Sequence, residues 1–581
     1  MKNEELLEKL ETWFTDGTSW DRDWRDNAKV WYDYYNGSQW TSEEVAGLED
    51  RGQAVTTYNH IAPSIDSIIG GERQNRPEIK MVGRTPDDEK IAEIKTSLYD
   101  YIADNTRSDD ELDKMELDAF ITGRGWMSVY PNMEGKEFDD ILHAHIDYRD
   151  MFIDSYSKRD DLKDARYIHQ AVFTDEDIIK KAFPKYMPYN SSVGQTGFES
   201  SSEDEMWYDG GDRDRVRLIN TWYRDEEGTV NTAVWVKGQL LYSKKQPYTI
   251  NEFPYTLFTV KRDLDNLPYG IVRGMISAQD EVNKRHSKAM HFMNARQVLA
   301  EENAFVDWTE AKKTLAKPDG ITKLADGALS EGRVQLVDNT QLAATHIQMM
   351  EHAKQQVMAM AGINASYLGQ SGQYESAKKA QGSMAAAQNV LVPILNKLRI
   401  TRHRLAYVTM SLVPDFYTDE KLIRILQPTG EYAFMPVNVP QLMDDGTLKM
   451  MNDLSQNDID VTIEDAPSGL NDRIEQFNQL LGIQGQTGRP IPMEILLRYS
   501  SLKDKHQLAA ELEQHYAMEA QLQQAQQQME QMQQQIQQMG GQVQQVESQL
   551  VQSNVARAVD SEVNKVKTEI QKEKNQILKN T

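Results

Sequence analysis

Residues 268–300, PYGIVRGMISAQDEVNKRHSKAMHFMNARQVLA, are the stretch of sequence that decides the fold. No proline follows Pro268 in this stretch, so nothing interrupts a helix there. The apolar residues recur at the spacing of one helical face, at Val272, Ile276, Val282, Ala289, Met290 and Met293. The pattern predicts one long helix over residues 270–300.

A compact insertion and a second helix follow. Residues 301–340 contain two turn signals, Pro318-Asp319-Gly320 and Asp326-Gly327. Helical spacing resumes over residues 341–361 and stops at Gly362. A helix, an insertion and a returning helix describe a part of the chain that extends far from its core. Such a part makes sense when neighbouring copies supply the missing contacts.

Further along the chain, a polar loop and a third long helix are expected. Residues 369–384, GQSGQYESAKKAQGSM, are small and polar, which is typical of a loop. A helix is predicted from about Ala385 to Val413, and short mixed elements are predicted over 420–507.

The chain before Pro268 is predicted to be helical first and β-rich afterwards. Gly123 and Gly125 separate the two parts, and the runs between Trp126 and about residue 260 have the alternation and β-branched content of strands. Residues 190–215 are rich in Gly, Ser and acidic side chains and are predicted to be a surface loop or partly disordered. Helices are expected over residues 1–60, 61–73, 86–105 and 109–122.

The C-terminal segment has its own composition. Gln makes up more than half of residues 521–549, and Gly540-Gly541 interrupts it. Its apolar residues are separated by alternating steps of three and four, which is a sustained heptad pattern and indicates helices packed against partner helices. A polar, Gln-rich composition is also compatible with disorder. The heptad residues are Leu522, Ala525, Met529, Met532, Ile536, Met539, Val543, Val546 and Leu550, and a second set follows at Val559, Val563, Val566, Ile570 and Ile577.

Composition excludes several classes of protein. The 581 residues include no Cys, which rules out disulfides, Cys-ligated zinc and thiol nucleophiles. The net charge is −26, and a protein that grips DNA tightly needs a strong basic patch instead. No apolar run approaches the ~18 residues that span a bilayer, and the charged N-terminus is unlike a signal peptide. The sequence therefore predicts a soluble, non-secreted protein that is not an enzyme and needs no cofactor.

Catalytic and metal-binding motifs give only weak signals. The chain contains no GxxxxGK[ST] loop for ATP hydrolysis. His143, His145 and Asp147 alternate on one face of a predicted strand, where a solvent-side polar face is favoured over a metal site. Asp458 and Asp460 belong to an acidic cluster that nuclease chemistry could use, but their alternation with apolar residues favours a strand with a polar face in water. No metal site is predicted.

Several motifs, taken in their order, resemble the portal proteins of tailed bacteriophages, especially the larger type found in short-tailed phages. The most specific is PYGIVRG at 268–274, followed by Gln279, Asp280, Asn283 and Ser287. The resemblance covers about residues 1–430, and the C-terminal heptad segment extends it. The other motifs are NHIAPSIDSIIGGERQNR at 59–76, DAFITGRG at 118–125, and MAGI at 360–363 with Leu368-Gly369.

The resemblance implies an α+β, mainly helical portal fold and a ring, twelve-fold in the family, at one capsid vertex of the virion. The chain is expected to assemble in the host cytoplasm with copies of itself and with major capsid and scaffold proteins. The expected parts are a wing at 1–268, a first stem helix at 269–300, a clip at 301–340, a second stem helix at 341–368, a tunnel loop at 369–384, a long wing helix at 385–427, a wing and crown region at 428–507, and a helical barrel at 508–581.

The resemblance also implies roles for particular residues. In the family the clip docks the terminase and later the tail adaptor, so Trp308, Lys312 and Lys313 are candidate contacts. Trp308 could instead pack within the clip itself. Lys378 and Lys379, an adjacent pair in the expected tunnel loop, are candidates for transient contact with the phosphates of passing double-stranded DNA. A solvated helix start is the alternative for this pair.

Two other classes of protein remain open at this stage. A self-assembling coiled-coil scaffold or phage tail protein would explain the heptad pattern of the C-terminal segment and the negative net charge. It would not explain the order of the helices and the insertion. A nuclease using Asp458 and Asp460 would need a basic DNA groove, which the sequence lacks.

Overall fold

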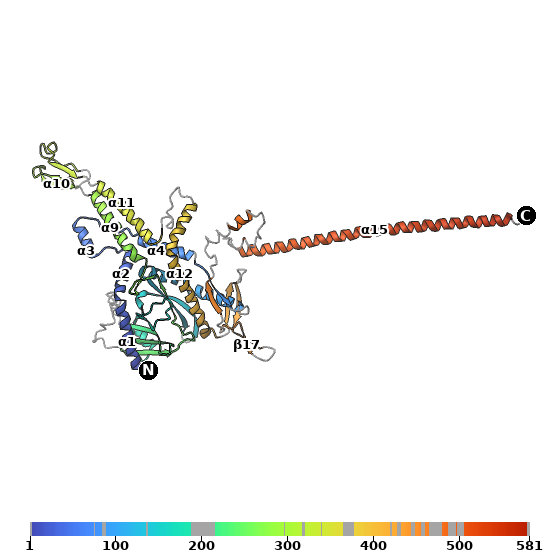
Figure 1. The fold of residues 1–581 in the computed structure, drawn as a ribbon, viewed down its shortest axis with the longest axis horizontal. Helices are drawn as coiled ribbons and strands as arrows, with labels where there is room; N and C mark the ends of the chain where they lie inside the picture. Colours follow the sequence, from blue (N-terminus) through green and yellow to red (C-terminus); the bar gives the residue numbers. More distant parts are fainter. Residues whose placement is uncertain are drawn as a thin grey trace. The chain divides into compact units, whose positions relative to one another are not determined.

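The computed structural model describes residues 3–74, 76–83, 89–134, 137–187, 215–294, 297–315, 320–337, 340–363, 377–418, 421–426, 432–442, 448–454, 459–463, 479–485, 496 and 505–577. The chain divides into two compact units, Met1–Asp472 and Arg473–Thr581, and each is described by itself. Helices and strands are mixed throughout the first unit, which confirms the predicted α+β class (Figure 1).

Six helices precede the first long strand. Helix α1 packs Leu6, Leu10 and Phe14 against the neighbouring sheet, because these residues lie on one face of the helix. Helix α3 begins with a capping box between Thr41 and Glu44. The prediction of helix over the first sixty residues is wrong for residues 51–60, which are not helical. The helices are α1 (Asn3–Trp20), α2 (Arg22–Asn36), α3 (Ser42–Asp50), α4 (Ile61–Gln74), α5 (Glu89–Asn105) and α6 (Ser108–Thr122).

Two antiparallel sheets occupy the middle of the unit. The smaller has the order β3-β2-β9, and the larger has the order β4-β5-β6-β7-β8. The strands confirm the predicted β-rich region. They are β2 (Arg124–Glu134), β3 (Glu137–Ile146), β4 (Met151–Ile153), β5 (Tyr167–Asp175), β6 (Arg215–Arg224), β7 (Val230–Val236), β8 (Gln239–Lys245) and β9 (Tyr255–Thr259), with the short helices η2 (Tyr148–Asp150) and α7 (Glu176–Ala182) between them. The predicted loop 190–215 lies outside the described residues up to residue 214.

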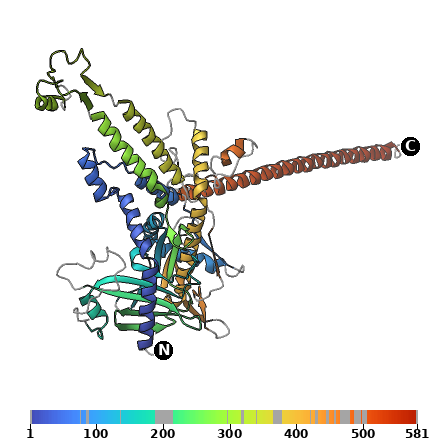
Figure 2. The same cartoon turned by 60° about the vertical axis from the view of Figure 1, so that its left-hand side comes forward.

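Two long helices extend from the sheets side by side, α9 (Val272–Asn294) and α11 (Thr340–Met360), and the insertion with α10 (Trp308–Leu315) lies at their far end (Figure 1). Figure 2 shows the same arrangement from another direction. The first helix was predicted to reach residue 300, but it ends at Asn294. Residues Gln297–Ala300 instead form β12, which pairs with β13 (Val334–Val337) and closes the base of the insertion.

The third long helix, α12, runs over Ala377–Phe416 and differs at both ends from the prediction. It begins within the stretch predicted as a loop, since residues 377–384 are helical. It does not continue to residue 427, because residues 421–426 form a strand. The remaining strands of the unit are β1 (Ile79–Gly83), β10 (Lys261–Arg262), β11 (Pro268–Tyr269), β14 (Lys421–Leu426), β15 (Tyr432–Val437), β16 (Val439–Leu442), β17 (Leu448–Met451) and β18 (Ile459–Ile463), where β18 pairs with β1.

One continuous apolar core joins the long helices to the smaller sheet. Buried members come from α2, α4, α6, α9 and α12, and include Trp24, Ile65, Phe120, Val272 and Leu405. The helices that lead away from the sheets are therefore anchored in the same core as the strands.

The second unit contains one helix of 73 residues, α15 (Lys505–Ile577). The helix continues through Gly540 and Gly541 without a break. Within the described part of the chain, no helix is both long enough and apolar enough to cross a membrane.

Candidate functional site

The motifs DAFITGRG at 118–125 and PYGIVRG at 268–274 lie against each other where α9 leaves the core. Gly123 ends α6 with a φ of +102°, which favours glycine, and a Cβ there would lie 2.2 Å from the backbone nitrogen of Tyr269. A Cβ on Gly270 would lie 2.2 Å from the carbonyl oxygen of Phe120. That same oxygen accepts a hydrogen bond from the Ile271 N–H at 2.7 Å. Only glycine allows the end of α6 and the start of α9 to approach this closely.

A row of buried polar side chains on α9 holds the non-helical segment that precedes α4. Gln279 accepts from the His60 N–H at 3.1 Å and donates to the Tyr58 carbonyl at 2.7 Å. Asn283 accepts from the Tyr58 N–H at 3.0 Å, and Ser287 donates to the Ala54 carbonyl at 2.7 Å. Since these three side chains are spaced by four residues, they lie on one face of the helix. They satisfy backbone groups that have no helix or sheet partner.

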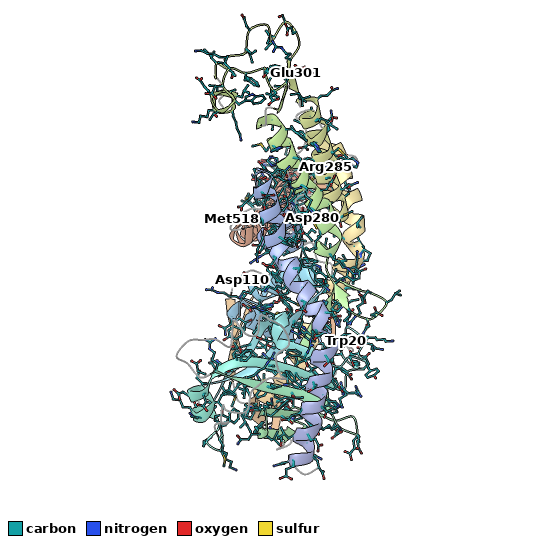
Figure 3. All side chains as sticks on the ribbon, turned by 90° about the vertical axis from the view of Figure 1, so that its left-hand side faces the viewer. Trp20, Asp110, Asp280, Arg285, Glu301 and Met518 are labelled. Atoms are coloured by element: carbon teal, nitrogen blue, oxygen red, sulfur yellow. The ribbon has the colours of Figure 1, made fainter. Side chains whose placement is uncertain are left out.

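Charged and phenolic groups extend this contact toward solvent. Asp280, labelled in Figure 3, accepts a hydrogen bond from the Tyr34 hydroxyl at 2.6 Å. Burial, together with the Asp280 carboxylate, raises the pKa of Tyr34. Lys284 pairs with Glu44 on α3 at 3.0 Å. The motif residues that follow PYGIVRG are thus the side chains that fix α9 to α2 and to the non-helical segment before α4.

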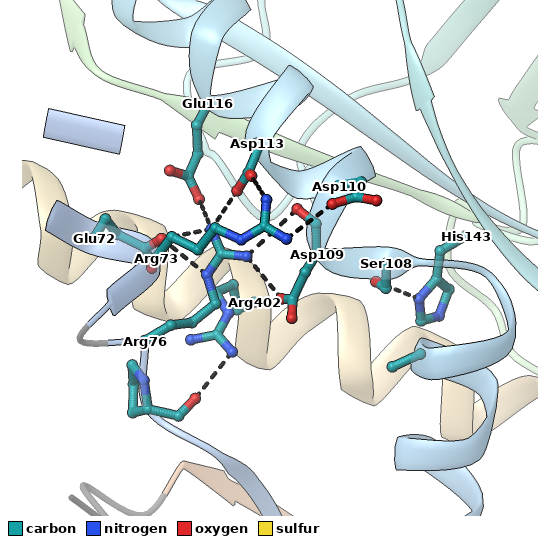
Figure 4. A network of polar contacts seen from close by, with 12 residues as sticks. Glu72, Arg73, Arg76, Ser108, Asp109, Asp110, Asp113, Glu116, His143 and Arg402 are labelled. Carbon is teal, nitrogen blue, oxygen red and sulfur yellow. Dashed lines mark hydrogen bonds and ion pairs between the residues drawn. The ribbon is translucent and has the colours of Figure 1, made fainter. Parts of the chain in front are cut away.

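A buried ionic network joins α4 to α6 (Figure 4). The Arg76 guanidinium contacts Glu72 at 2.5 Å, Asp109 at 2.7 Å, and Asp113 and Glu116 at 2.9 Å. Burial would lower the pKa of Arg76, but hydrogen bonding to Glu72 and the surrounding carboxylates raise it above its usual value. Burial and the nearby Glu72 raise the pKa of Glu116 in spite of Arg76.

The helix α12 completes this part of the core. Arg402 donates to the Pro77 carbonyl at 2.9 Å, and burial lowers its pKa. His143 is fully buried between Ser108 and Thr409, at 2.8 Å from each hydroxyl. Burial lowers the pKa of His143 to about 4, so it is neutral at physiological pH.

The prediction of a solvent-side face is therefore wrong for His143, whereas His145 is partly exposed. His143 is buried, and His145 lies 2.8 Å from Asp118. Asp147 pairs with Arg149 at 2.6 Å. The described residues contain no group of three or more His, Asp or Glu side chains positioned to hold a metal ion. The side chains of Asp458 and Asp460 lie outside the described part, although residue 460 belongs to β18 as expected for a strand.

The insertion carries its own small core and a largely exposed surface. Ala304, Phe305 and Ala311 form the core. Trp308 packs its ring edge-on against Phe305 at 4.8 Å between centroids and donates to the Glu302 carbonyl at 2.9 Å, yet it is still 49% exposed. Trp308 thus has a contact within the insertion and an accessible face. Lys312 and Lys313 lie in α10 and are exposed. Other exposed apolar side chains here are Val306, Ile321, Leu329 and Leu336.

The groove between α9 and α11 was not foreseen from the sequence. It is lined by Ser277, Glu281, Met349, His352 and Met360, among others. Met349 and Met360 are about half exposed. Its only signal in the sequence was the number of Met residues on these two helices.

The predicted DNA-contacting and self-associating residues lie in helices. Lys378 and Lys379 are in the first turn of α12, as in the alternative interpretation of a helix start, and their side chains lie outside the described part. The predicted heptad residues of α15 expose more than half of their side-chain area, from 55% to 66%: Leu522, Met529, Met532, Ile536, Met539, Val543, Val546 and Leu550.

The comparison with known proteins places the chain in a family. The family model of phage P22-like portal proteins matches residues 11–230 and 225–558. The chain therefore belongs to the phage P22-like portal protein family, a family of structural virion components. The chain is also 22% identical, over 418 residues, to the portal protein of Helicobacter pylori bacteriophage KHP30. That match covers 70% of this chain and 66% of the relative, so it spans just under two thirds of the relative's length.

Proposed function

We propose that this protein is the subunit of a portal ring at one capsid vertex, through which DNA is packaged and later ejected. The observation that carries the proposal is the helix pair α9 and α11, which projects from the core and exposes Met349 and Met360 in the groove along it. Exposed apolar surface of this kind marks a contact with another molecule. In a ring, the equivalent helices of the neighbouring copies cover it.

The charge of the protein suits a channel through which DNA slides. A net charge of −26 repels phosphates at long range, and strong phosphate binding would slow movement. Lys378 and Lys379 supply local positive charge at the start of α12, where each copy would touch the passing backbone transiently and without reading its sequence. The proposal keeps the division of the chain into wing, stem, clip, tunnel loop and barrel that the family resemblance implies.

The insertion is the proposed docking platform for the terminase and then for the tail adaptor. Trp308 offers a half-exposed aromatic face on a small rigid core, and such residues are enriched at the centre of protein interfaces. Lys312 and Lys313 lie on the same short helix and would pair with acidic groups of the partner. Major capsid and scaffold proteins are the expected partners of the ring in the virion, which assembles in the host cytoplasm.

The exposed stripe of α15 supports association of the C-terminal helices of several copies. Nothing within a single long helix can bury such a stripe. Self-association in a coiled coil would also suit a scaffold or tail protein. The match to the portal family across the chain favours the portal ring.

The test is assembly of the purified protein, measured by mass photometry and negative-stain electron microscopy. Met349→Glu places a charge in the groove between α9 and α11 and is expected to abolish closed rings. Gln355→Glu adds the same charge at an exposed position of α11 that does not line the groove, and it is expected to leave rings intact. Rings that form equally well with both substitutions would refute the role of the groove.

A further inference from the structure

Residues 51–60 form a non-helical strip along one face of α9. The buried side chains of Gln279, Asn283 and Ser287 bind backbone groups of this strip by hydrogen bonds. Because the strip belongs to no helix or sheet, these contacts satisfy its backbone and fix its path over α9.

The outer side of the strip is uncharged and partly apolar. No Asp, Glu, Lys or Arg lies between Arg51 and His60. Val55 is 38% exposed and Tyr58 is 49% exposed. The Tyr58 ring packs against His286 at 4.2 Å between ring centroids, so its orientation is already set. A side chain that is ordered in advance loses little conformational entropy when a partner covers it.

The groove between α9 and α11 opens on the opposite face of α9. Ser277 and Glu281 line the groove, and each lies two residues before a residue that binds the strip, Gln279 or Asn283. Two residues correspond to roughly 200° around a helix, so the two faces point in nearly opposite directions. The groove has a volume of about 670 Å³, and Met349 is 45% exposed within it.

The strip and the groove also lie at the same level of the helix pair. The strip contacts α9 between Gln279 and Ser287, and the groove is lined by α9 residues from Ser277 to Glu281. Copies related by rotation about an axis along the helix pair meet at equal heights. Each copy then presents its strip to one neighbour and its groove to the other, which is the heterologous contact that closes a ring.

We propose that the strip of one copy occupies the groove between α9 and α11 of the next copy, with Val55 and Tyr58 against Met349. The proposal rests on the proposed portal ring and specifies which two surfaces of the subunit meet in it. It gives the buried polar side chains of α9 a role beyond stability, because they present the strip to the neighbouring copy.

The chemistry of the two surfaces matches. Besides Met349, the groove is lined by small side chains such as Ser277 and Ala353, which leave room for the strip. The acidic residue of the groove, Glu281, pairs with Arg285 at 2.5 Å, so an uncharged strip meets no unpaired carboxylate there. The flexible Met side chain adapts its shape to an apolar or aromatic partner.

The absence of Cys from the chain allows a direct test by thiol cross-linking of assembled, full-length rings. The variant with Tyr58→Cys and Met349→Cys is treated with a short bis-maleimide and analysed on a denaturing gel. Within one chain the two thiols lie on opposite sides of the helix pair, so the reagent links them only between copies. Every copy is then linked to both neighbours, and the expected result is a ladder that rises to the full ring. Each single variant is expected to remain monomeric.

A second pair and a control isolate the contact. Thr57→Cys with His352→Cys keeps the apolar side chains in place and is expected to give the same ladder. Tyr58→Cys with Gln355→Cys, an exposed position of α11 outside the groove, is expected to remain monomeric. Rings in which both groove pairs stay monomeric overturn the proposal, and so does an equal ladder with the control pair. A wild-type chain that forms no rings refutes the proposed function instead.

Discussion

Substitution of Gly270 by Ala tests whether the close approach of α6 and α9 is essential. The added Cβ would lie 2.2 Å from the Phe120 carbonyl oxygen and 2.5 Å from that of Ile121, whereas ordinary contact begins at 3.4 Å. The start of α9 would have to move by about 1 Å, and core overpacking of this kind costs about 1–3 kcal/mol. The displacement would also break the hydrogen bond between Ile271 and Phe120, with a loss of about 1 kcal/mol.

The total loss expected for Gly270→Ala is therefore about 2–4 kcal/mol of unfolding free energy. Gly274→Ala is the matched control: a Cβ there meets nothing within 4 Å, and in a helix Ala is more favourable than Gly by about 0.5–1 kcal/mol. The assay is urea unfolding followed by Trp fluorescence at equal protein concentrations. Equal midpoints for Gly270→Ala and the wild type would refute the steric argument.

Three further predictions test the polar contacts of the core. Arg76→Met leaves buried carboxylates without their counter-charge and is expected to lower the free energy of unfolding by about 3–5 kcal/mol. The control Arg73→Met, at a half-exposed ion pair, is expected to lower it by less than about 1 kcal/mol. Comparable losses for the two variants in urea unfolding would contradict a stabilising role of the buried network. His143 has a folded-state pKa of about 4 against about 6.5 in the unfolded chain, so the unfolded chain alone takes up a proton between these values and stability falls by about 3 kcal/mol as pH drops from 6.5 to 4. His143→Gln is expected to flatten that part of the pH profile of the unfolding midpoint, and an unchanged slope would refute the assignment. Gln279→Leu leaves the backbone of residues 58–60 with unpaired groups and is expected to destabilise by about 2–4 kcal/mol and to increase amide exchange there; unchanged exchange would show that the segment is held by other contacts.

Periodicity predicted the large elements of this fold because their apolar residues face one core. The helix at 341–361, the strands between 126 and 260 and the C-terminal helix were all expected from spacing alone. The ends of elements were less predictable. The composition of residues 297–300 does not separate them from the preceding helix. In the structure they form β12, which pairs with β13 at the base of the insertion. Tertiary pairing decides such cases, and a single sequence does not contain it.

In the candidate site, sequence motifs identified important residues, but tertiary contacts determine what those residues do. The motif residues Gly123, Gly270, Gln279 and Asn283 were singled out by their sequence, but their purpose depends on contacts across more than a hundred residues. His143 was misplaced because alternation along a strand reports which residues share a face, while the packing of α6 and α12 decides whether that face is buried. The loop prediction for residues 369–384 is wrong at its end for a different reason: Ala and Lys are good helix formers, and α12 already begins at Ala377.

Electron microscopy of the purified, assembled protein tests the central claim most directly. The portal account predicts closed rings with a central channel, in which the α9 and α11 helices of adjacent copies lie side by side around the axis. Filaments, or bundles held together only through α15 with no closed ring at any protein concentration, would contradict it.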